Sequence, residues 1–192
     1  MFSRAWSAAR AILAGLALVL LGVWAPPGAA AAQEPAPPDQ NAFAQMIDSQ
    51  GQHVGLAALR QTADGVEITV QTTGLSPGEH GIHIHAVGAC DPPGFTTAGD
   101  HFNPQSQQHG LRNTFGPHAG DLPNLPVGTD GTGAMMITTN RVTLGPGGAS
   151  LLDEDGSAIV VHAGWDNQAS DPAGNSGDRV ACGVLRQAAP GQ

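Results

Sequence analysis

Short stretches in which apolar and polar residues alternate recur along the chain between residues 42 and 185. In one of them Val66, Ile68 and Val70 alternate with Glu67 and Thr69, and this period of two is typical of a strand with one buried face. Segments rich in Gly and Pro separate the stretches, and no amphipathic helix of useful length is present. The pattern predicts strands at residues 44–48, 54–61, 66–70, 82–85, 132–138, 149–152, 158–163 and 179–185.

Many short strands joined by such turns predict an all-β domain, an antiparallel sandwich or barrel. Two segments, at about residues 87–131 and 164–178, are too long and irregular to be hairpin turns. Long ordered loops on a rigid scaffold commonly carry function. We therefore expect the chemistry of this protein to lie in these two loops and at the strand ends beside them.

The N-terminus has the pattern of a secretory signal peptide. Residues 1–10 carry two Arg and no acid, residues 11–25 are apolar without a charge, and three Ala occupy positions 30–32. An uncleaved membrane anchor is the alternative, although the apolar run is shorter than the roughly 20 residues that span a bilayer. We expect a signal peptide over residues 1–32, a Pro-rich disordered tether over 33–41, a domain over 42–187 and a flexible tail over 188–192. The protein is then exported to the periplasm or the medium.

Composition narrows the function further. The chain has 192 residues, 41% of them apolar, which fits one globular domain. There is no Lys, and the net charge is −9, so a nucleic-acid partner is excluded, as is a protein that spans the membrane many times. After signal cleavage we expect no membrane association. In an oxidising compartment the two cysteines, Cys90 and Cys182, predict one disulfide, with two free buried thiols as the alternative.

Histidines cluster strongly. Five lie within 36 residues, and a sixth ends a later strand: His83, His85, His101, His109, His118 and His162. Because side chains alternate along a strand, His83 and His85 point the same way, as two ligands of one metal would. Two solvated histidines on a polar face would give the same pattern. His80 has the opposite parity and His53 sits beside a turn, so we expect both to be hydrogen-bonded structural residues rather than ligands.

The first long loop adds His101, His109, His118 and Asp121, and three imidazoles with one carboxylate make a closed tetrahedral zinc set. Six His and Asp121 give seven ligands, one fewer than two four-coordinate sites need. A deprotonated imidazole has two donor nitrogens, so one shared ring closes the gap. The count does not say which His is shared, and an open-faced copper site with five positions is equally compatible with it.

Five motifs together are similar to those of the copper–zinc superoxide dismutase family. They are GEHGIHIHAVGAC, AGDHFNPQSQQHG, PHAGDLPN, IVVHAGWDN and GDRVACGVL, in the family's order and spacing over roughly residues 42–186. The resemblance, to a bacterial exported member, implies an eight-stranded antiparallel Greek-key β-barrel or sandwich with two long functional loops. It implies a superoxide dismutase acting on the superoxide anion, with one copper and one zinc ion per subunit, as a monomer or homodimer.

The resemblance also assigns residues. Copper ligands would be His83, His85, His101 and His162; zinc ligands would be His101, His109, His118 and Asp121, so that His101 is shared. Arg179 would attract the superoxide anion, and Asp166 would hydrogen-bond one copper histidine and one zinc histidine. The family disulfide matches Cys90–Cys182. Copper would cycle between Cu(II) and Cu(I), and His101 would release copper in the reduced state and carry a proton.

A second hypothesis is that the protein is a secreted store of copper or zinc with the same fold, and two arguments keep this hypothesis open. Fold alone does not establish activity, and Asp100 precedes His101 where relatives usually carry Gly or Pro. All seven ligand positions and Arg179 are nevertheless present, and this favours the enzyme.

Overall fold

The protein was analysed as a computed structural model that describes residues 40–189. The expected signal peptide, residues 33–39 of the expected tether and residues 190–192 of the expected tail lie outside this range. Among the described residues there are ten strands and one short 3₁₀ helix, with the following bounds: β1 Asn41–Asp48, β2 His53–Thr62, β3 Gly65–Thr72, β4 Gly78–His80, β5 Ile82–His85, η1 Thr96–Ala98, β6 Leu125–Val127, β7 Gly133–Thr139, β8 Ala158–His162, β9 Arg179–Val184 and β10 Arg186–Gln187. Within residues 40–189 no helix is long and apolar enough to cross a membrane.

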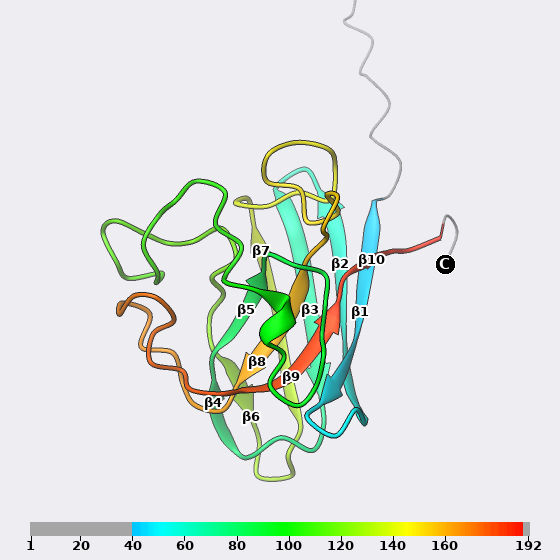
Figure 1. The fold of residues 1–192 in the computed structure, drawn as a ribbon, viewed down its shortest axis with the longest axis vertical. Helices are drawn as coiled ribbons and strands as arrows, with labels where there is room; N and C mark the ends of the chain where they lie inside the picture. The colour runs from blue at the N-terminus through cyan, green and yellow to red at the C-terminus, as the bar shows by residue number, and fades with distance from the viewer. Residues whose placement is uncertain (1–39, 190–192) are drawn as a thin grey trace, which may run out of the picture. The chain divides into compact units, whose positions relative to one another are not determined.

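All strand pairs are antiparallel, in the order β4-β6-β7-β3-β2-β1-β9-β8-β5, with β10 added to β1. The sheet curls into a nearly closed barrel (Figure 1). Pairs β3–β7 and β1–β9 join strands far apart in sequence, as Greek-key connections do. The predicted all-β fold class is confirmed. The described residues contain ten strands rather than eight: the sequence missed β4, β6 and β10, which have only two or three residues each, and one predicted strand does not form.

The apolar residues of the alternating stretches point into the barrel interior. In β3, Val66, Ile68 and Val70 are fully buried, and Ile68 lies opposite Leu59 of β2 and Ile137 of β7. Burying each such aliphatic side chain contributes roughly 1.5–3 kcal/mol. The periodic strands therefore form the core that holds the loops in place.

One predicted strand, residues 149–152, is wrong. This segment makes only an isolated bridge between Thr143 and Ser150. Leu151 is nevertheless fully buried and joins the core cluster, with Leu152 packed against it. The apolar residues of this segment lie in a loop that packs onto the core, and they do not pair in the sheet. The alternation of apolar and polar residues cannot distinguish such a loop from a strand.

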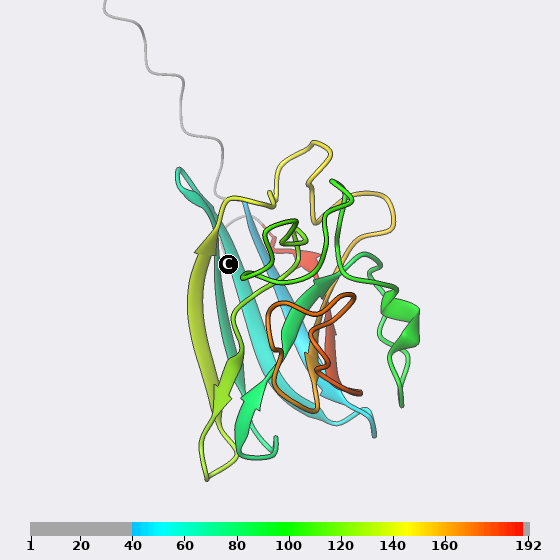
Figure 2. The same cartoon turned by 90° about the vertical axis from the view of Figure 1, so that its left-hand side faces the viewer.

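Both long loops lie on the same side of the barrel. The part of the green loop that follows η1 and the orange loop between β8 and β9 occupy the same flank in Figure 1, and both face the viewer after a quarter turn in Figure 2. Their extents agree with the expected 87–131 and 164–178, except that β6 lies within the first. The loops that carry the candidate chemistry therefore meet.

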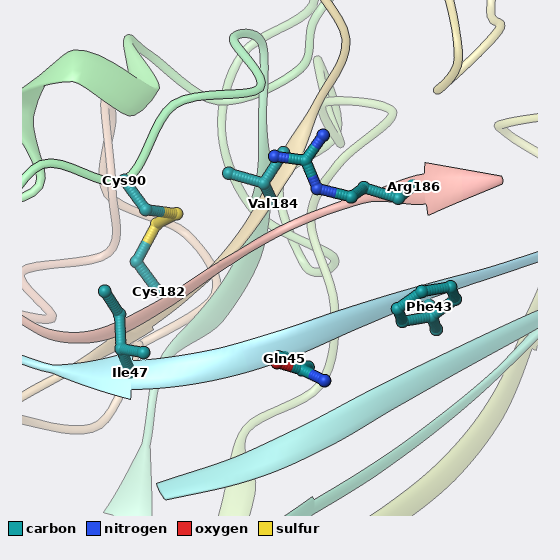
Figure 3. A pocket seen from close by; sticks show the side chains of 7 residues that line it. All are labelled: Phe43, Gln45, Ile47, Cys90, Cys182, Val184 and Arg186. Carbon is teal, nitrogen blue, oxygen red and sulfur yellow. A yellow bond between two sulfur atoms is a disulfide. The ribbon is translucent and has the colours of Figure 1, made fainter. Parts of the chain in front are cut away.

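A disulfide joins the first loop to β9. Cys90 and Cys182 are bonded, as predicted, and no other cysteine exists in the chain. Figure 3 shows the bond beside Ile47 on the outer face of β1, where the lining residues enclose a groove of about 390 Å³. Phe95, fully buried, packs nearby in a small cluster with Ala98 and Cys182. The start of the loop is thus fixed to the barrel both covalently and by packing.

Candidate metal centre

The free edge of β5 gathers the candidate ligands. β5 ends the sheet, and segments of the first loop pair with its edge through isolated bridges, His83 with Asp121 and His85 with His101. The Ile84 N–H donates to the Gly120 carbonyl at 2.9 Å, and the Ile84 carbonyl accepts from the Phe102 N–H at 2.8 Å. A Cβ at Gly120 would collide with the Ile84 carbonyl oxygen, so this approach requires glycine.

Four buried imidazoles form the first cluster: His83, His85, His101 and His162, with one ring nitrogen of each lying within 4.8 Å of the others. As the strand parity predicts, His83 and His85 come together while Ile82 and Ile84 enter the apolar core. Four buried ring nitrogens in this cluster have no hydrogen-bond partner: His83 Nδ1, His85 Nε2, His101 Nε2 and His162 Nε2. Buried polar atoms are seldom left unpaired, and four that converge are what a bound cation requires. Imidazole nitrogens suit copper in both of its common oxidation states.

The opposite nitrogens of these rings are held in place. His85 Nδ1 lies 2.9 Å from the Gly99 carbonyl, and His162 Nδ1 lies 3.0 Å from the Gly177 carbonyl. His83 Nε2 lies 2.8 Å from Asp166 Oδ2. In each case the outer nitrogen donates, so the inner nitrogen keeps its lone pair for a metal.

The second cluster is built around Asp121. Its Oδ1 lies 2.9 Å from His101 Nδ1, 3.0 Å from His109 Nδ1 and 3.3 Å from His118 Nδ1. His118 Nδ1 is also 3.3 Å from His101 Nδ1. A tetrahedral zinc ion would place its ligand atoms about 3.3–3.6 Å apart, given bonds of about 2.0–2.2 Å. The observed separations of 2.9 to 3.3 Å are at or slightly below this spacing, so the three imidazoles and the carboxylate fit zinc after a small outward shift of the Asp121 carboxylate.

His83 is also within reach of the second cluster, since one atom each of His83, His101, His109 and Asp121 lie within 4.8 Å of one another. However, His83 offers Nδ1 to the first cluster and Nε2 to Asp166. We therefore place His118 in the second cluster. His101 is the ring with one nitrogen in each cluster, Nε2 in the first and Nδ1 in the second.

Burial and charge set the protonation of the site. Burial lowers the pKa of His83 to about 3, of His85 to about 2 and of His162 to about 4. For His109 burial acts the same way, but the Asp121 and Asp166 carboxylates outweigh it and raise the pKa to about 9. Burial would raise the pKa of Asp121, but hydrogen bonds from the histidines around it hold that pKa well below its usual range. At neutral pH and without metal, the first cluster is therefore uncharged, while the second pairs the ionised Asp121 with a protonated His109.

Asp166 links the two clusters, as the family resemblance implies. Its Oδ2 accepts from His83 Nε2 at 2.8 Å, and its Oδ1 accepts from His109 Nε2 at 3.0 Å. Asn124 fixes the Asp166 backbone with two hydrogen bonds, of 2.8 and 2.9 Å. No sequence signal singled out Asn124, although it closes the motif PHAGDLPN.

An open cavity of about 450 Å³ leads to the first cluster. His85, His101 and His162 line it, as do Arg179, Asp100 and Asp171. Arg179 Nη1 donates to the Phe95 carbonyl at 2.8 Å, and Nη2 donates to the Gly99 carbonyl at 2.7 Å. Gly99 thus holds both Arg179 and His85. The exposed Asp100 faces this cation and partly offsets its field.

The remaining histidines are not part of either cluster. His80 is buried, with Nδ1 2.7 Å from the His162 carbonyl and Nε2 2.8 Å from the Ser76 carbonyl, so its structural role is confirmed. His53 is exposed at the start of β2, and within residues 40–189 its ring makes no hydrogen bond, contrary to expectation.

An antiparallel barrel that holds two adjoining four-ligand clusters, with one imidazole common to both, defines a protein built for a pair of metal ions. The family model for copper/zinc superoxide dismutase matches residues 53–185, and the chain belongs to this family.

Similar proteins support the same assignment. The chain is 45% identical over 150 residues to Cu-Zn superoxide dismutase 2 of Aquifex aeolicus, covering 77% of this chain and 88% of that protein. It is 40% identical over 139 residues to the Cu-Zn superoxide dismutase of Caulobacter vibrioides, covering 71% and 80%. A crystal structure of a superoxide dismutase-like protein from Bacillus subtilis matches with a TM-score of 0.73 and 39% identity, over 75% of this chain and 97% of the other.

Proposed function

We propose that the protein is a superoxide dismutase, which converts two superoxide anions and two protons to oxygen and hydrogen peroxide. The observation that carries the proposal is the convergence of four unpartnered imidazole nitrogens at a cavity whose wall presents the Arg179 guanidinium. Bound copper supplies a reversible one-electron change between Cu(II) and Cu(I). The residues of the chain do the rest: they attract the anion, orient the ligands and deliver protons.

The copper ligands in this proposal are His83 Nδ1, His85 Nε2, His101 Nε2 and His162 Nε2, the four orphaned atoms. The zinc ligands are Nδ1 of His101, His109 and His118 together with Asp121 Oδ1, supported by their separations of 2.9 to 3.3 Å. Zinc has no redox chemistry, so its role is to hold His101 and order the loop.

Arg179 and His101 are the proposed catalytic residues. Arg179 binds the substrate anion: burial lowers its pKa, but a guanidinium stays charged at any physiological pH. When His101 Nε2 is not bound to copper, it holds a proton for peroxide formation, while Nδ1 remains beside Asp121. This nitrogen is buried at the base of the cavity, where a bound anion can receive the proton directly.

The decisive test compares superoxide consumption by protein loaded with copper and zinc and by protein loaded with zinc alone. We expect fast consumption that requires copper and exceeds that of the same concentration of free copper. Consumption no faster than that of free copper would refute the enzyme and leave a metal store. The visible copper band separates these cases, since only a dismutase should recover its band when superoxide is added after reduction.

Replacing Arg179 by alanine should lower the second-order rate constant for superoxide roughly tenfold or more, because the cavity loses its fixed cation. Arg179→Lys should retain part of the rate, and copper content should not change in either variant. The matched control is Arg186→Ala, which removes the same charge from the exposed strand β10. Equal losses in the two alanine variants would show a general effect of net charge rather than a local one.

The domain limits and the location of the protein are further parts of the proposal. We infer that residues 1–32 form a cleaved export signal and that a tether follows, which ends at residue 40 rather than 41 because Asn41 already pairs in β1. The catalytic domain then extends from residue 41 to about residue 187 and acts in the periplasm or the medium. A disulfide that closes a loop across 92 residues supports an oxidising location. Mass spectrometry of the protein recovered outside the cytoplasm should find Gln33 at the N-terminus; an intact Met1 would refute cleavage.

A further inference from the structure

Asp166 receives donors on both oxygens, and half of them come from one residue, Gln168. Besides His109, Asp166 Oδ1 accepts from the Gln168 backbone N–H at 2.6 Å. Besides His83, Asp166 Oδ2 accepts from the Gln168 side-chain Nε2 at 2.9 Å. Each oxygen therefore has one imidazole donor and one donor from Gln168. Hydrogen bonds to an ionised carboxylate are roughly twice as strong as neutral ones, so this pairing fixes the orientation of the carboxylate.

Gln168 is itself held by the loop that carries the second cluster. Its Nε2 also donates to the Leu122 carbonyl at 3.1 Å, and its Oε1 accepts from the Leu111 N–H at 3.3 Å. The side chain is buried, with 7% of the residue exposed. Gln168 thus joins Asp166 to the segments that follow His109 and Asp121.

The backbone at this residue is unusual, since Gln168 has φ 61°, a left-handed conformation that favours glycine or asparagine. Strain of this kind persists where surrounding contacts require it. Gly174 also packs against Asp166, where even a Cβ would collide with Oδ1, so there is no room at Gly174 for another donor.

We propose that Gln168 is a positioning residue that orients Asp166, and through it His83 and His109, for both metal sites. The proposal rests on the metal ligands proposed above. Because each carboxylate oxygen also accepts a hydrogen bond from Gln168, its hydrogen bond from the imidazole N–H is weaker than it would be alone. Because one carboxylate serves one ligand of each metal, a change at Gln168 should alter both sites together.

The test uses Gln168→Met, which keeps the length of the side chain but cannot donate, and Gln168→Gly, which removes the side chain and relieves the left-handed backbone. We expect both to weaken zinc binding about tenfold, at the low end of the effect of changing a group that orients a ligand. The affinity is measured by competition with a chromophoric zinc chelator. Both should also shift the electron paramagnetic resonance parameters of bound Cu(II), since His83 is released from its fixed orientation.

The control is Gln105→Met, the same change at an exposed site in the first loop. If the role of Gln168 were purely structural, Gln168→Met and Gln168→Gly would change the free energy of unfolding in opposite directions. The zinc affinity and the Cu(II) spectrum would then be those of the unmodified protein. That result would overturn the proposal, as would failure of both variants to fold. Failure of the unmodified protein to bind zinc or copper tightly would instead refute the ligand assignment.

Discussion

Replacing Asp121 by asparagine is expected to weaken zinc binding by more than about 100-fold, beyond the loss caused by changing a group that only orients a ligand. Asp121 uses both oxygens: Oδ1 faces the three Nδ1 atoms of the second cluster, and Oδ2 accepts the backbone N–H groups of Gly110 and His118 at 2.8 and 2.9 Å. Asparagine has one acceptor oxygen. Its NH₂ group must therefore face either the metal position or two N–H donors, and the charge that zinc requires is lost.

Chelator competition on the folded, metal-free protein measures this affinity. Asp64→Asn is the matched control, because Asp64 is exposed in the turn between β2 and β3, far in sequence from the ligands. The Cu(II) spectrum should change as well, since His101 loses the carboxylate beside its Nδ1. Unaltered zinc affinity in Asp121→Asn would show that Asp121 is not a ligand.

Strand parity explains why half of the site could be predicted without a structure. The period of two fixes His83 and His85 on one face, and it also excludes His80, whose two ring nitrogens lie 2.7 and 2.8 Å from backbone carbonyls. Residue types in the first loop then predict a metal set around Asp121. The choice of His101 as the shared ring came from family resemblance, because ligand counting cannot distinguish one imidazole from another.

Other parts of the molecule depend on contacts that no local pattern records. The guanidinium of Arg179 is held by the carbonyls of Phe95 and Gly99, and backbone carbonyls carry no sequence signal. Gln168 was missed for a related reason, since a glutamine in a loop is ordinarily solvated and its left-handed backbone is a product of the folded loop. Strands β4 and β6 have three residues each, too few to show a period.

Removing the disulfide should lower the free energy of unfolding of the metal-free protein by about 4–5 kcal/mol, because the bond closes a loop across 92 residues and restricts the unfolded chain. The variant is Cys90→Ala with Cys182→Ala, since Cys182 is fully buried and alanine leaves no unpaired hydroxyl. Urea unfolding of this variant, of the oxidised protein and of the reduced protein measures the difference. A variant as stable as the oxidised protein would contradict the expectation.

Loss of the disulfide should also slow the reaction with superoxide several-fold, although the bond touches neither cluster. Cys90 anchors the segment that ends in the Phe95 and Gly99 carbonyls, which orient Arg179. Phe95 still packs against Ala98 and β8, so the segment should loosen rather than unfold. The loss of rate should therefore be smaller than in Arg179→Ala, with copper content unchanged. A loss equal to that of Arg179→Ala would mean that the disulfide alone holds this segment in place.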